Sequence, residues 1–259
     1  MQFLQSRDNP QFKHWLKLTQ QAGARRKHQQ TLLDGVHLLA AALEAGCCPL
    51  AVCYPANISL NEEIDTLLQR LPRQTRQFTL ASALFRELSP VASPTGILAC
   101  IPWCSPPMPT QPGFALLLEA IQDPGNLGSI LRTAAAAGVE AVYCSDACVD
   151  VWSPKVLRGG MGAHFRLAIA ERCDLSAYAL HFDGKVVATS LTGQTDLFAL
   201  DLRSSVAFIL GNEGAGISPA LQALASEQVR IPMQTGMESL NVAASAAICC
   251  FETLRQRRV

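Results

Sequence analysis

The chain has 259 residues, carries 21 Lys and Arg against 21 Asp and Glu, and is 49% hydrophobic. This length suits one large or two modest domains, and the hydrophobic content is ample for a core. No run of 18 apolar residues is present, and the first residues do not form a signal-peptide pattern. The sequence therefore predicts no membrane association.

Ten cysteines are present, among them two adjacent pairs, without CxxC or Cys/His metal spacing. In a chain of this size without a signal, such cysteines are expected to be reduced and mostly buried. We therefore expect no metal site and a cytoplasmic location.

The first 28 residues are basic, with six cations against Asp8 alone. Phe12, His14, Trp15 and His28 are interleaved with them. Cations neutralise phosphates and aromatic faces stack on unpaired bases, so the segment is a candidate RNA contact. An amphipathic helix with an ordinary solvated face is the alternative. The cations are Arg7, Lys13, Lys17, Arg25, Arg26 and Lys27.

Hydrophobic patterning predicts alternating strands and helices before residue 104. A helical spacing covers residues 31–45, short strands are predicted over 50–54 and 76–80, and helices over 64–71 and 82–88. This alternation favours a small α/β domain over residues 1–104.

A proline-rich stretch separates this part from the rest of the chain. Residues 101–112 contain five prolines, which remove amide donors and fix φ, so neither a helix nor a central strand is expected. We interpret residues 105–112 as a linker and residues 113–259 as a second domain.

The second domain has the pattern of a mostly parallel sheet. Apolar runs predict strands, a glycine-bearing turn leads into a helix over 130–137, and Ser218 with Pro219 starts a short helix. The turn has GxxG and not GxGxxG spacing, which argues against a dinucleotide site. Lys155, Arg158 and the glycines after them form either an anion site or a loop into a helix. The predicted strands cover 114–119, 139–144, 185–190, 206–210 and 229–231.

Two turns near the C-terminus each follow a strand-like run. The first holds Glu213 between glycines, and the second ends in Ser239 and Asn241. Glycines permit φ > 0 and close approach to a ligand, and strand ends of open α/β sheets are where ligands bind. These side chains therefore mark a candidate site.

Three ordered segments resemble the SpoU (TrmH) family of RNA ribose 2′-O-methyltransferases, in the SPOUT superfamily. They are DPGNLGSILRTA at 123–134, ILGNEGAGI at 209–217, and IPM through ESLNVA at 231–243. The resemblance spans residues 114–255. Residues 6–35 are similar to the L30e-like RNA-substrate-binding domain of many members, with Asp34 where a glutamate is usual.

The resemblance implies that the second domain forms a deep trefoil knot. It also implies S-adenosylmethionine as cofactor, held largely by main-chain groups, and a homodimer formed through this domain. The small residues of the last helix, which starts near Asn241, suit such an interface or close packing on the sheet. By position, the implied cofactor contacts are Thr189, Ser190, Leu210, Gly211, Gly214, Ile231, Met233, Ser239, Leu240 and Ala244.

The resemblance further implies that Asn126 and Arg132 hold the target nucleotide's phosphate and help activate its 2′-hydroxyl. An arginine, with a pKa of roughly 13, is a poor free base, so Arg132 is interpreted first as a phosphate clamp. Glu213, Ser239 and Asn241 would complete the catalytic set. The predicted RNA-binding residues are Arg7, Lys13, Arg25, Arg26, Lys27, Arg132 and Arg158.

The sequence thus predicts an S-adenosylmethionine-dependent RNA 2′-O-ribose methyltransferase, with ribosomal RNA favoured as substrate. A transfer RNA methyltransferase is one alternative. A non-catalytic RNA-binding or ribosome-assembly protein with the same fold is another, although the intact set of polar site residues argues against it.

Overall fold

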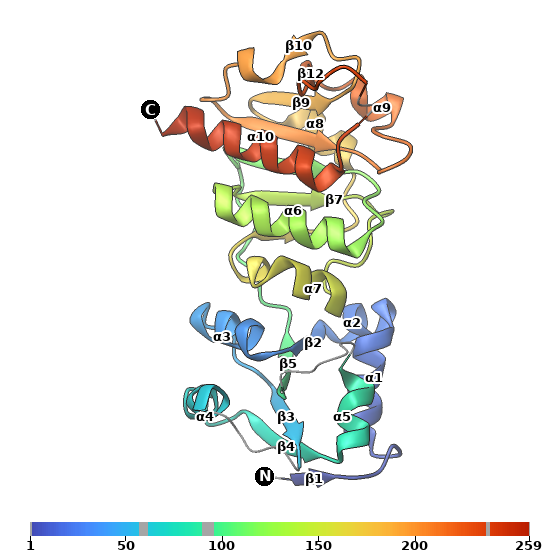
Figure 1. Ribbon diagram of the computed structural model, residues 1–259, viewed down its shortest axis with the longest axis vertical. Coiled ribbons are helices and arrows are strands. Elements are labelled where there is room, and N and C mark those ends of the chain that lie inside the picture. The colour runs from blue at the N-terminus through green and yellow to red at the C-terminus, as the bar shows by residue number, and fades with distance from the viewer. Residues whose placement is uncertain (1, 57–61, 90–95, 237–238, 259) are drawn as a thin grey trace. The chain divides into compact units, whose positions relative to one another are not determined.

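The computed structural model describes residues 2–56, 62–89, 96–236 and 239–258. The chain divides into two compact units (Figure 1). One contains Met1–Cys104 with Trp152–Phe165, and the other contains Ser105–Val151 with Arg166–Val259. The break at residue 104 coincides with the start of the predicted linker. Trp152–Phe165 differs from the sequence-based assignment, because this segment groups with the N-terminal unit.

The N-terminal unit is built on a five-stranded mixed sheet in the order β1-β4-β3-β5-β2. Strands β1, β4 and β3 run parallel, whereas β5 is antiparallel to both β3 and β2. The strands are β1 (Gln2–Leu4), β2 (Gln30–Asp34), β3 (Ala51–Pro55), β4 (Arg76–Leu80) and β5 (Leu98–Pro102).

Five helices pack around this sheet. Asn9 caps the first, α1, by accepting from the amides of Gln11 and Phe12, and Pro10 occupies its first turn. Phe12 and Trp15 are 0% and 1% exposed and pack in the core, so they are not available to stack on RNA bases. The helices are α1 (Pro10–Gln20), α2 (Ala22–His28), α3 (Val36–Glu44), α4 (Glu62–Gln69) and α5 (Ser82–Leu88).

The prediction of one helix over residues 31–45 is wrong in its first part. Residues 30–34 form β2, Gly35 adopts φ +112°, and only then does α3 begin. A short apolar run fits a buried strand as well as a helix, and only the antiparallel pairing of β2 with β5 decides between them. The predictions for 76–80 and 82–88 are confirmed.

The segment that groups with the N-terminal unit forms α7 (Pro154–Gly160) and the 3₁₀ helix η1 (Ala163–Phe165). Thr31 Oγ1 of β2 donates to the Trp152 carbonyl at 2.8 Å. The Trp103 and Trp152 rings stack with centroids 5.3 Å apart. A Cβ at Gly162 would lie 2.7 Å from the Ala41 Cβ, so only glycine permits this close approach.

The C-terminal unit contains a seven-stranded sheet in the order β10-β12-β9-β11-β6-β7-β8, in which every described pairing is parallel. The predicted mostly parallel α/β fold is therefore confirmed. The strands are β6 (Phe114–Leu118), β7 (Ala141–Cys144), β8 (Ala168–Ala170), β9 (Lys185–Thr189), β10 (Thr195–Asp196), β11 (Val206–Leu210) and β12 (Glu227–Arg230).

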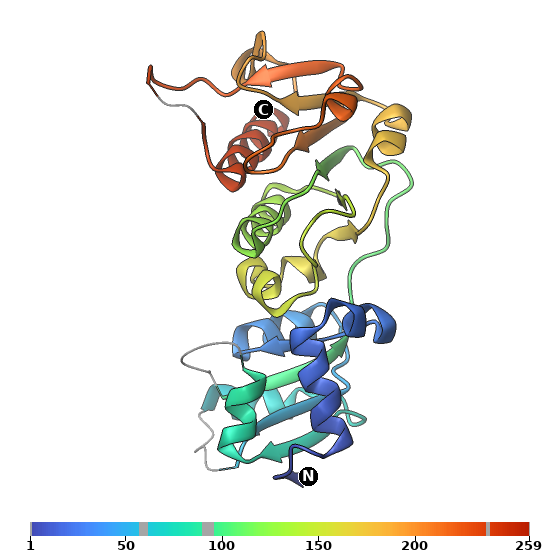
Figure 2. The ribbon, with the colours of Figure 1, turned by 90° about the vertical axis from the view of Figure 1, so that its right-hand side faces the viewer.

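Helices cover both faces of this sheet. α6 (Pro124–Ala137) and α10 (Val242–Arg257) pack side by side against one face (Figures 1 and 2). On the other face, α8 (Leu175–His181) and α9 (Pro219–Gln222) contribute buried side chains to an apolar cluster with alternate residues of the strands. Period-two alternation thus gives each buried strand two apolar faces.

The helix predicted over 130–137 begins earlier, at Pro124. The Asp123 side chain caps it by accepting from the Asn126 amide at 2.8 Å, and the proline suits the first helical turn. Residues 124–129, interpreted as part of a glycine-bearing turn, therefore form the start of α6. This places Asn126 close to the helix start.

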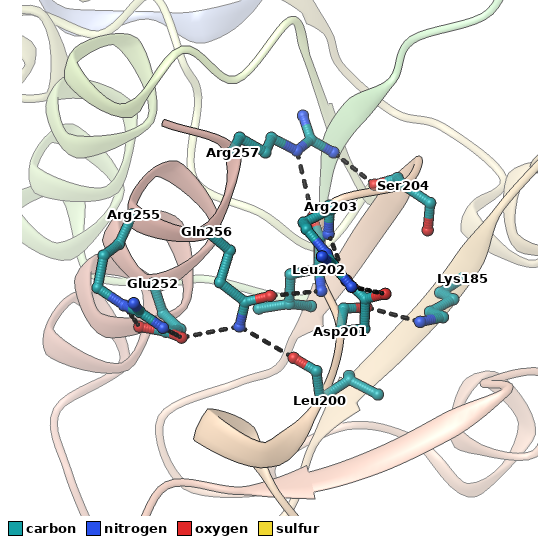
Figure 3. A network of polar contacts seen from close by, with 10 residues as sticks. All are labelled: Lys185, Leu200, Asp201, Leu202, Arg203, Ser204, Glu252, Arg255, Gln256 and Arg257. Carbon is teal, nitrogen blue, oxygen red and sulfur yellow. Dashed lines mark hydrogen bonds and ion pairs between the residues drawn. The ribbon is translucent and has the colours of Figure 1, made fainter. Parts of the chain in front are cut away.

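The end of α10 is tied to the sheet by polar contacts (Figure 3). The Arg257 guanidinium donates to three carbonyls, those of Leu202 at 3.2 Å, Ser204 at 2.7 Å and Gly113 at 2.9 Å. The preceding residue, Gln256, accepts from the Leu202 amide through its side-chain oxygen. These contacts hold the end of the helix to the segments that lead into β6 and β11.

Candidate functional site

The first component of the site is the turn after β11. The Asn212 and Gly216 backbones exchange two hydrogen bonds, at 3.0 and 2.9 Å, which close the turn into a ring. A Cβ on Gly211 would lie 2.3 Å from the Gly216 carbonyl carbon, so no other residue fits there. The Asn212 side chain accepts from the amides of Gly214 and Ala215, each at 2.9 Å. The turn is therefore held rigidly and exposes main-chain groups.

A hydrogen-bonded chain of side chains joins the three segments that resemble the family. Asn126 Nδ2 donates to Glu213 Oε1 at 3.0 Å, and Asn241 Nδ2 donates to Asn126 Oδ1 at 2.9 Å. Asn241 Oδ1 accepts from the amides of Ala243 and Ala244 and thereby caps α10. Asn126 thus meets partners that are 87 and 115 positions away in the sequence.

Glu213 is the charged member of this chain. Partial burial opposes its ionisation, but hydrogen bonds from the Asn126 side chain and from the amides of Glu213 itself, Asp123 and Gln122 outweigh that effect. Together they lower the pKa of Glu213 below its ordinary value. Glu213 is therefore a carboxylate at neutral pH, and its oxygens act as acceptors that orient Asn126.

A cavity of about 970 Å³ lies next to the hydrogen-bonded side chains of Glu213, Asn126 and Asn241. It opens beyond the carboxyl ends of β9, β11 and β12. Glu213 and Asn241 line it, whereas Asn126 and Arg132 do not. Arg230 and Asp196 also line it and were not predicted, although Arg230 directly precedes a predicted contact. Predicted cofactor-binding residues in the lining are Thr189, Ser190, Leu210, Gly211, Gly214, Ile231, Met233, Ser239 and Leu240.

Ala244 is the predicted cofactor contact that is not in the cavity lining. It is exposed on the first turn of α10, and its amide donates to Asn241 Oδ1 at 3.3 Å. Its place in the structure is thus at the helix cap, next to the cavity. Glu238, in the third family-like segment, lies outside the described residues.

Arg132 is exposed on α6, two turns after Asn126. The exposed positions of that helix form one stripe that also includes Ser129 and Ala136. Arg132 therefore faces solvent and not the cavity of its own chain.

The predicted basic cluster is divided by the structure. Arg25 is 4% exposed, and its guanidinium donates to the Leu18 carbonyl at 2.6 Å, so it caps the end of α1 and does not face an incoming RNA. Arg26 is half-buried and Lys27 exposed. Arg7 is paired with Glu87, and Lys13 pairs with Asp8 at 2.7 Å.

Arg158 is exposed on α7 of the N-terminal unit. Burial raises the pKa of Asp34, while the Ser89 hydroxyl, which donates at 2.6 Å, and the charge of Arg158 oppose the rise. Arg158 is thus within electrostatic range of Asp34. Arg158 is part of the N-terminal unit's surface and is not among the residues that line the cavity.

The described residues contain no group of three or more His, Cys, Asp or Glu side chains that could hold a metal ion. All ten cysteines are free thiols. No described helix is long and apolar enough to cross a membrane.

The fold and the lining residues define an α/β protein with a cavity at the carboxyl edge of a parallel sheet. Residues 113–251 match the model of the SpoU rRNA Methylase family, and residues 9–99 match an MRM3-like substrate binding domain. The chain therefore belongs to the SpoU rRNA methylase family.

Individual relatives resemble the chain over nearly its full length. An uncharacterized tRNA/rRNA methyltransferase of Synechocystis sp. is 35% identical, covering 97% of this chain and 93% of the relative. The 23S rRNA (guanosine(2553)-2′-O)-methyltransferase RlmP of Bacillus subtilis is 31% identical, covering 97% and 98%. The solved structure of AviRb from Streptomyces viridochromogenes, in complex with AdoMet, superposes with a TM-score of 0.87 at 27% identity, covering 96% of this chain and 98% of that one.

Proposed function

We propose that this protein transfers a methyl group from S-adenosylmethionine to a ribose 2′-hydroxyl of ribosomal RNA. The observation that carries the proposal is the chain Glu213–Asn126–Asn241, which unites three distant segments beside a cavity at the sheet edge. Relatives named as 23S rRNA 2′-O-methyltransferases and a neighbour solved with AdoMet support it.

The cavity fits the cofactor on structural grounds. The backbone around Gly211 packs so closely that a Cβ there is excluded, and Gly211–Gly214 and Gly216 of this turn line the cavity. Thr189 and Ser190 add hydroxyls, while Leu210 and Ile231 add apolar surface. This mixture suits an adenosine with a short charged tail. When bound, S-adenosylmethionine supplies an electrophilic methyl group.

The protein's own contribution is positioning and electrostatics. Asn126 has a fixed orientation, because its amide nitrogen donates to Glu213 and its oxygen accepts from Asn241. Glu213, with its lowered pKa, is a weak base and serves as an orienting acceptor. Arg132, always charged, holds the phosphate of the target nucleotide.

We also propose a homodimer formed through the C-terminal unit and a trefoil knot in it. One face of α10 is apolar and exposed or half-buried, which supports an interface of the same chain. Arg132 faces away from its own cavity, so a partner subunit would bring it to a site. The residues of the α10 face are Ala244, Ala247, Ile248 and Phe251.

Arg26 and Lys27 remain proposed RNA contacts of the N-terminal unit, together with Arg158 and more weakly the ion-paired Arg7 and Lys13. Free thiols and a ribosomal RNA substrate support a cytoplasmic location.

Labelled S-adenosylmethionine and RNA from a strain lacking this protein test the function. We expect a 2′-O-methylnucleoside in digested ribosomal RNA and none in transfer RNA. Label in the transfer RNA fraction alone would identify a transfer RNA methyltransferase. Binding of S-adenosylhomocysteine, measured by calorimetry, without transfer into naked RNA or ribosomal subunits would favour a non-catalytic RNA-binding protein.

A further inference from the structure

The segment that joins β6 to α6, Glu119–Asp123, has every one of its five backbone amides bonded to another part of the chain. No residue of this segment belongs to a helix or strand, yet none of these donors depends on water. The acceptors, in chain order, are the Leu210 carbonyl at 2.9 Å, Ser145 Oγ at 2.9 Å, Cys148 Sγ at 3.3 Å and, for the last two amides, the Glu213 carboxylate at 3.4 and 3.3 Å.

The Ala120 carbonyl of this segment, and the carbonyl of Leu118 just before it at the end of β6, are held by side chains of the same two turns. The Leu118 carbonyl accepts from Cys148 Sγ at 3.2 Å, and the Ala120 carbonyl accepts from Asn212 Nδ2 at 2.8 Å. Cys148 Sγ therefore bonds the backbone on both sides of Ala120, at Leu118 of β6 and at Ile121 of the segment. Ser145 and Cys148 belong to one turn, closed by a hydrogen bond from the Cys148 amide to the Ser145 carbonyl at 3.2 Å.

The backbone held in this way is strained. Ala120 has φ +53°, in the left-handed region that an alanine adopts at a cost. Such a conformation persists only where the surroundings over-determine it. Here the surroundings are side chains on the turn after β7 and on the glycine turn after β11.

We propose that Ser145 and Cys148 are positioning residues for methyl transfer, acting through Ala120 and Ile121 on Asn126. The segment ends at Asp123, which caps α6, and Asn126 lies in the first turn of that helix. A shift of the segment therefore moves Asn126 relative to the cavity. This inference rests on the proposed function.

Four variants of the full chain test the proposal, two that remove a side-chain partner and two that serve as controls. Cys148→Ala and Ser145→Ala each remove a side-chain partner of the strained segment, whereas Cys148→Ser keeps a group that both accepts and donates. Cys173→Ala is the matched control, since Cys173 is also half-buried and near the end of β7 but makes no described side-chain bond to residues 119–123. The readouts are kcat, S-adenosylhomocysteine affinity, and hydrogen exchange of the Ala120 and Ile121 amides.

For the two alanine variants we expect kcat to fall roughly 10- to 100-fold, the loss associated with ångström-scale misplacement. Exchange of the Ala120 amide should accelerate in Ser145→Ala, and that of Ile121 in Cys148→Ala. S-adenosylhomocysteine affinity should stay within about threefold, because neither residue lines the cavity. Cys148→Ser should recover most of kcat, and Cys173→Ala should match the natural protein.

Faster exchange with unchanged kcat would overturn the positioning role. An equal loss of kcat, cofactor affinity and thermal stability would overturn it too and assign both residues to folding alone. If the natural protein transfers no methyl group to any RNA, the proposed function fails, and this role fails with it. Those results are distinguishable because the natural protein is measured first.

Discussion

At the scale of single residues, Asn126 is the centre of the site although it does not line the cavity. Its two amide atoms have different partners, a carboxylate and another amide, so only one orientation satisfies both. Asn241 Oδ1 accepts from the Ala243 amide at the start of α10, so the Asn241 amide nitrogen is the atom that points toward Asn126. A polar chain with one consistent set of donors and acceptors is rigid, which is what an orienting group requires.

Arg132 is predicted to act on RNA and not on the cofactor. Arg132→Ala should abolish methyl transfer, whereas S-adenosylhomocysteine affinity should remain within about threefold because the side chain lies outside the cavity. Calorimetry and a transfer assay measure the two quantities. Arg132→Lys serves as the control for charge. We expect its methyl transfer to stay impaired, because a lysine cannot donate the bidentate hydrogen bonds that a guanidinium makes to phosphate. A large loss of cofactor affinity would contradict the assignment.

Glu213 should make stability depend on pH in acid. Its pKa is lowered in the folded protein, so the carboxylate stabilises the fold above its unfolded pKa, and this contribution disappears as pH falls through the folded pKa. Glu213→Gln should therefore lower the melting temperature at pH 7, and the difference from the natural protein should shrink below about pH 4. Glu227→Gln is the control for loss of one negative charge. A difference that stays constant down to pH 3 would argue against this role.

At the scale of structural elements, the turn after β11 depends on a glycine that nothing can replace. Gly211→Ala places a Cβ 2.3 Å from the Gly216 backbone, which cannot move without opening the turn. We expect a loss of about 3 kcal/mol in the free energy of unfolding and no measurable S-adenosylhomocysteine binding.

Gly214→Ala is the steric control for that variant. The nearest atom to its Cβ would be Asn212 Oδ1 at 3.6 Å, an ordinary contact, so its melting temperature should be unchanged. Equal melting temperatures for both variants would show that the turn tolerates displacement.

The end of α10 is predicted to stabilise the C-terminal unit through Arg257. The guanidinium bonds three carbonyls and lies 5.0 Å from the centre of the Phe114 ring, and burial lowers its pKa despite the charge of Glu140. Arg257→Ala should cost about 2 kcal/mol, as for hydrogen bonds from a partly buried charge. Urea unfolding measures this, with the exposed Arg258→Ala as control. Equal urea midpoints for Arg257→Ala and Arg258→Ala would show that the contacts of Arg257 do not stabilise the fold.

At the scale of the whole molecule, the apolar face of α10 predicts the oligomeric state. Phe251 is 49% exposed in a single chain, and a homodimer through this face would cover it. Phe251→Asp should convert a dimer into a monomer, because an unpaired charge is costly to bury. Sedimentation velocity measures the mass, with Phe198→Asp, at 53% exposure on the same unit, as control. A natural protein that sediments as a monomer at micromolar concentration would contradict the dimer.

Sequence patterns predicted most elements whose signals are local. The strand at 206–210 is confirmed because its continuous apolar run is typical of a buried parallel strand. The short helix after Ser218 begins as predicted and ends at Gln222. The strands β1, β8 and β10 were missed, since they have only two or three residues and depend on pairing with distant segments. The strand β5 was missed because its last two residues begin the proline-rich stretch, for which the expectation of no central strand is wrong at residues 101–102: β5 pairs with both β2 and β3.

The sequence by itself determined the α/β class and the family, through the three motifs that contain Asn126, Glu213 and Asn241. These follow from patterns and motifs read along the chain. Tertiary structure alone decided that residues 30–34 form a strand, that Phe12, Trp15 and Arg25 are buried, and that Trp152–Phe165 groups with the N-terminal unit. The physical reason is that burial and strand pairing depend on contacts between residues far apart in sequence, which no local pattern encodes.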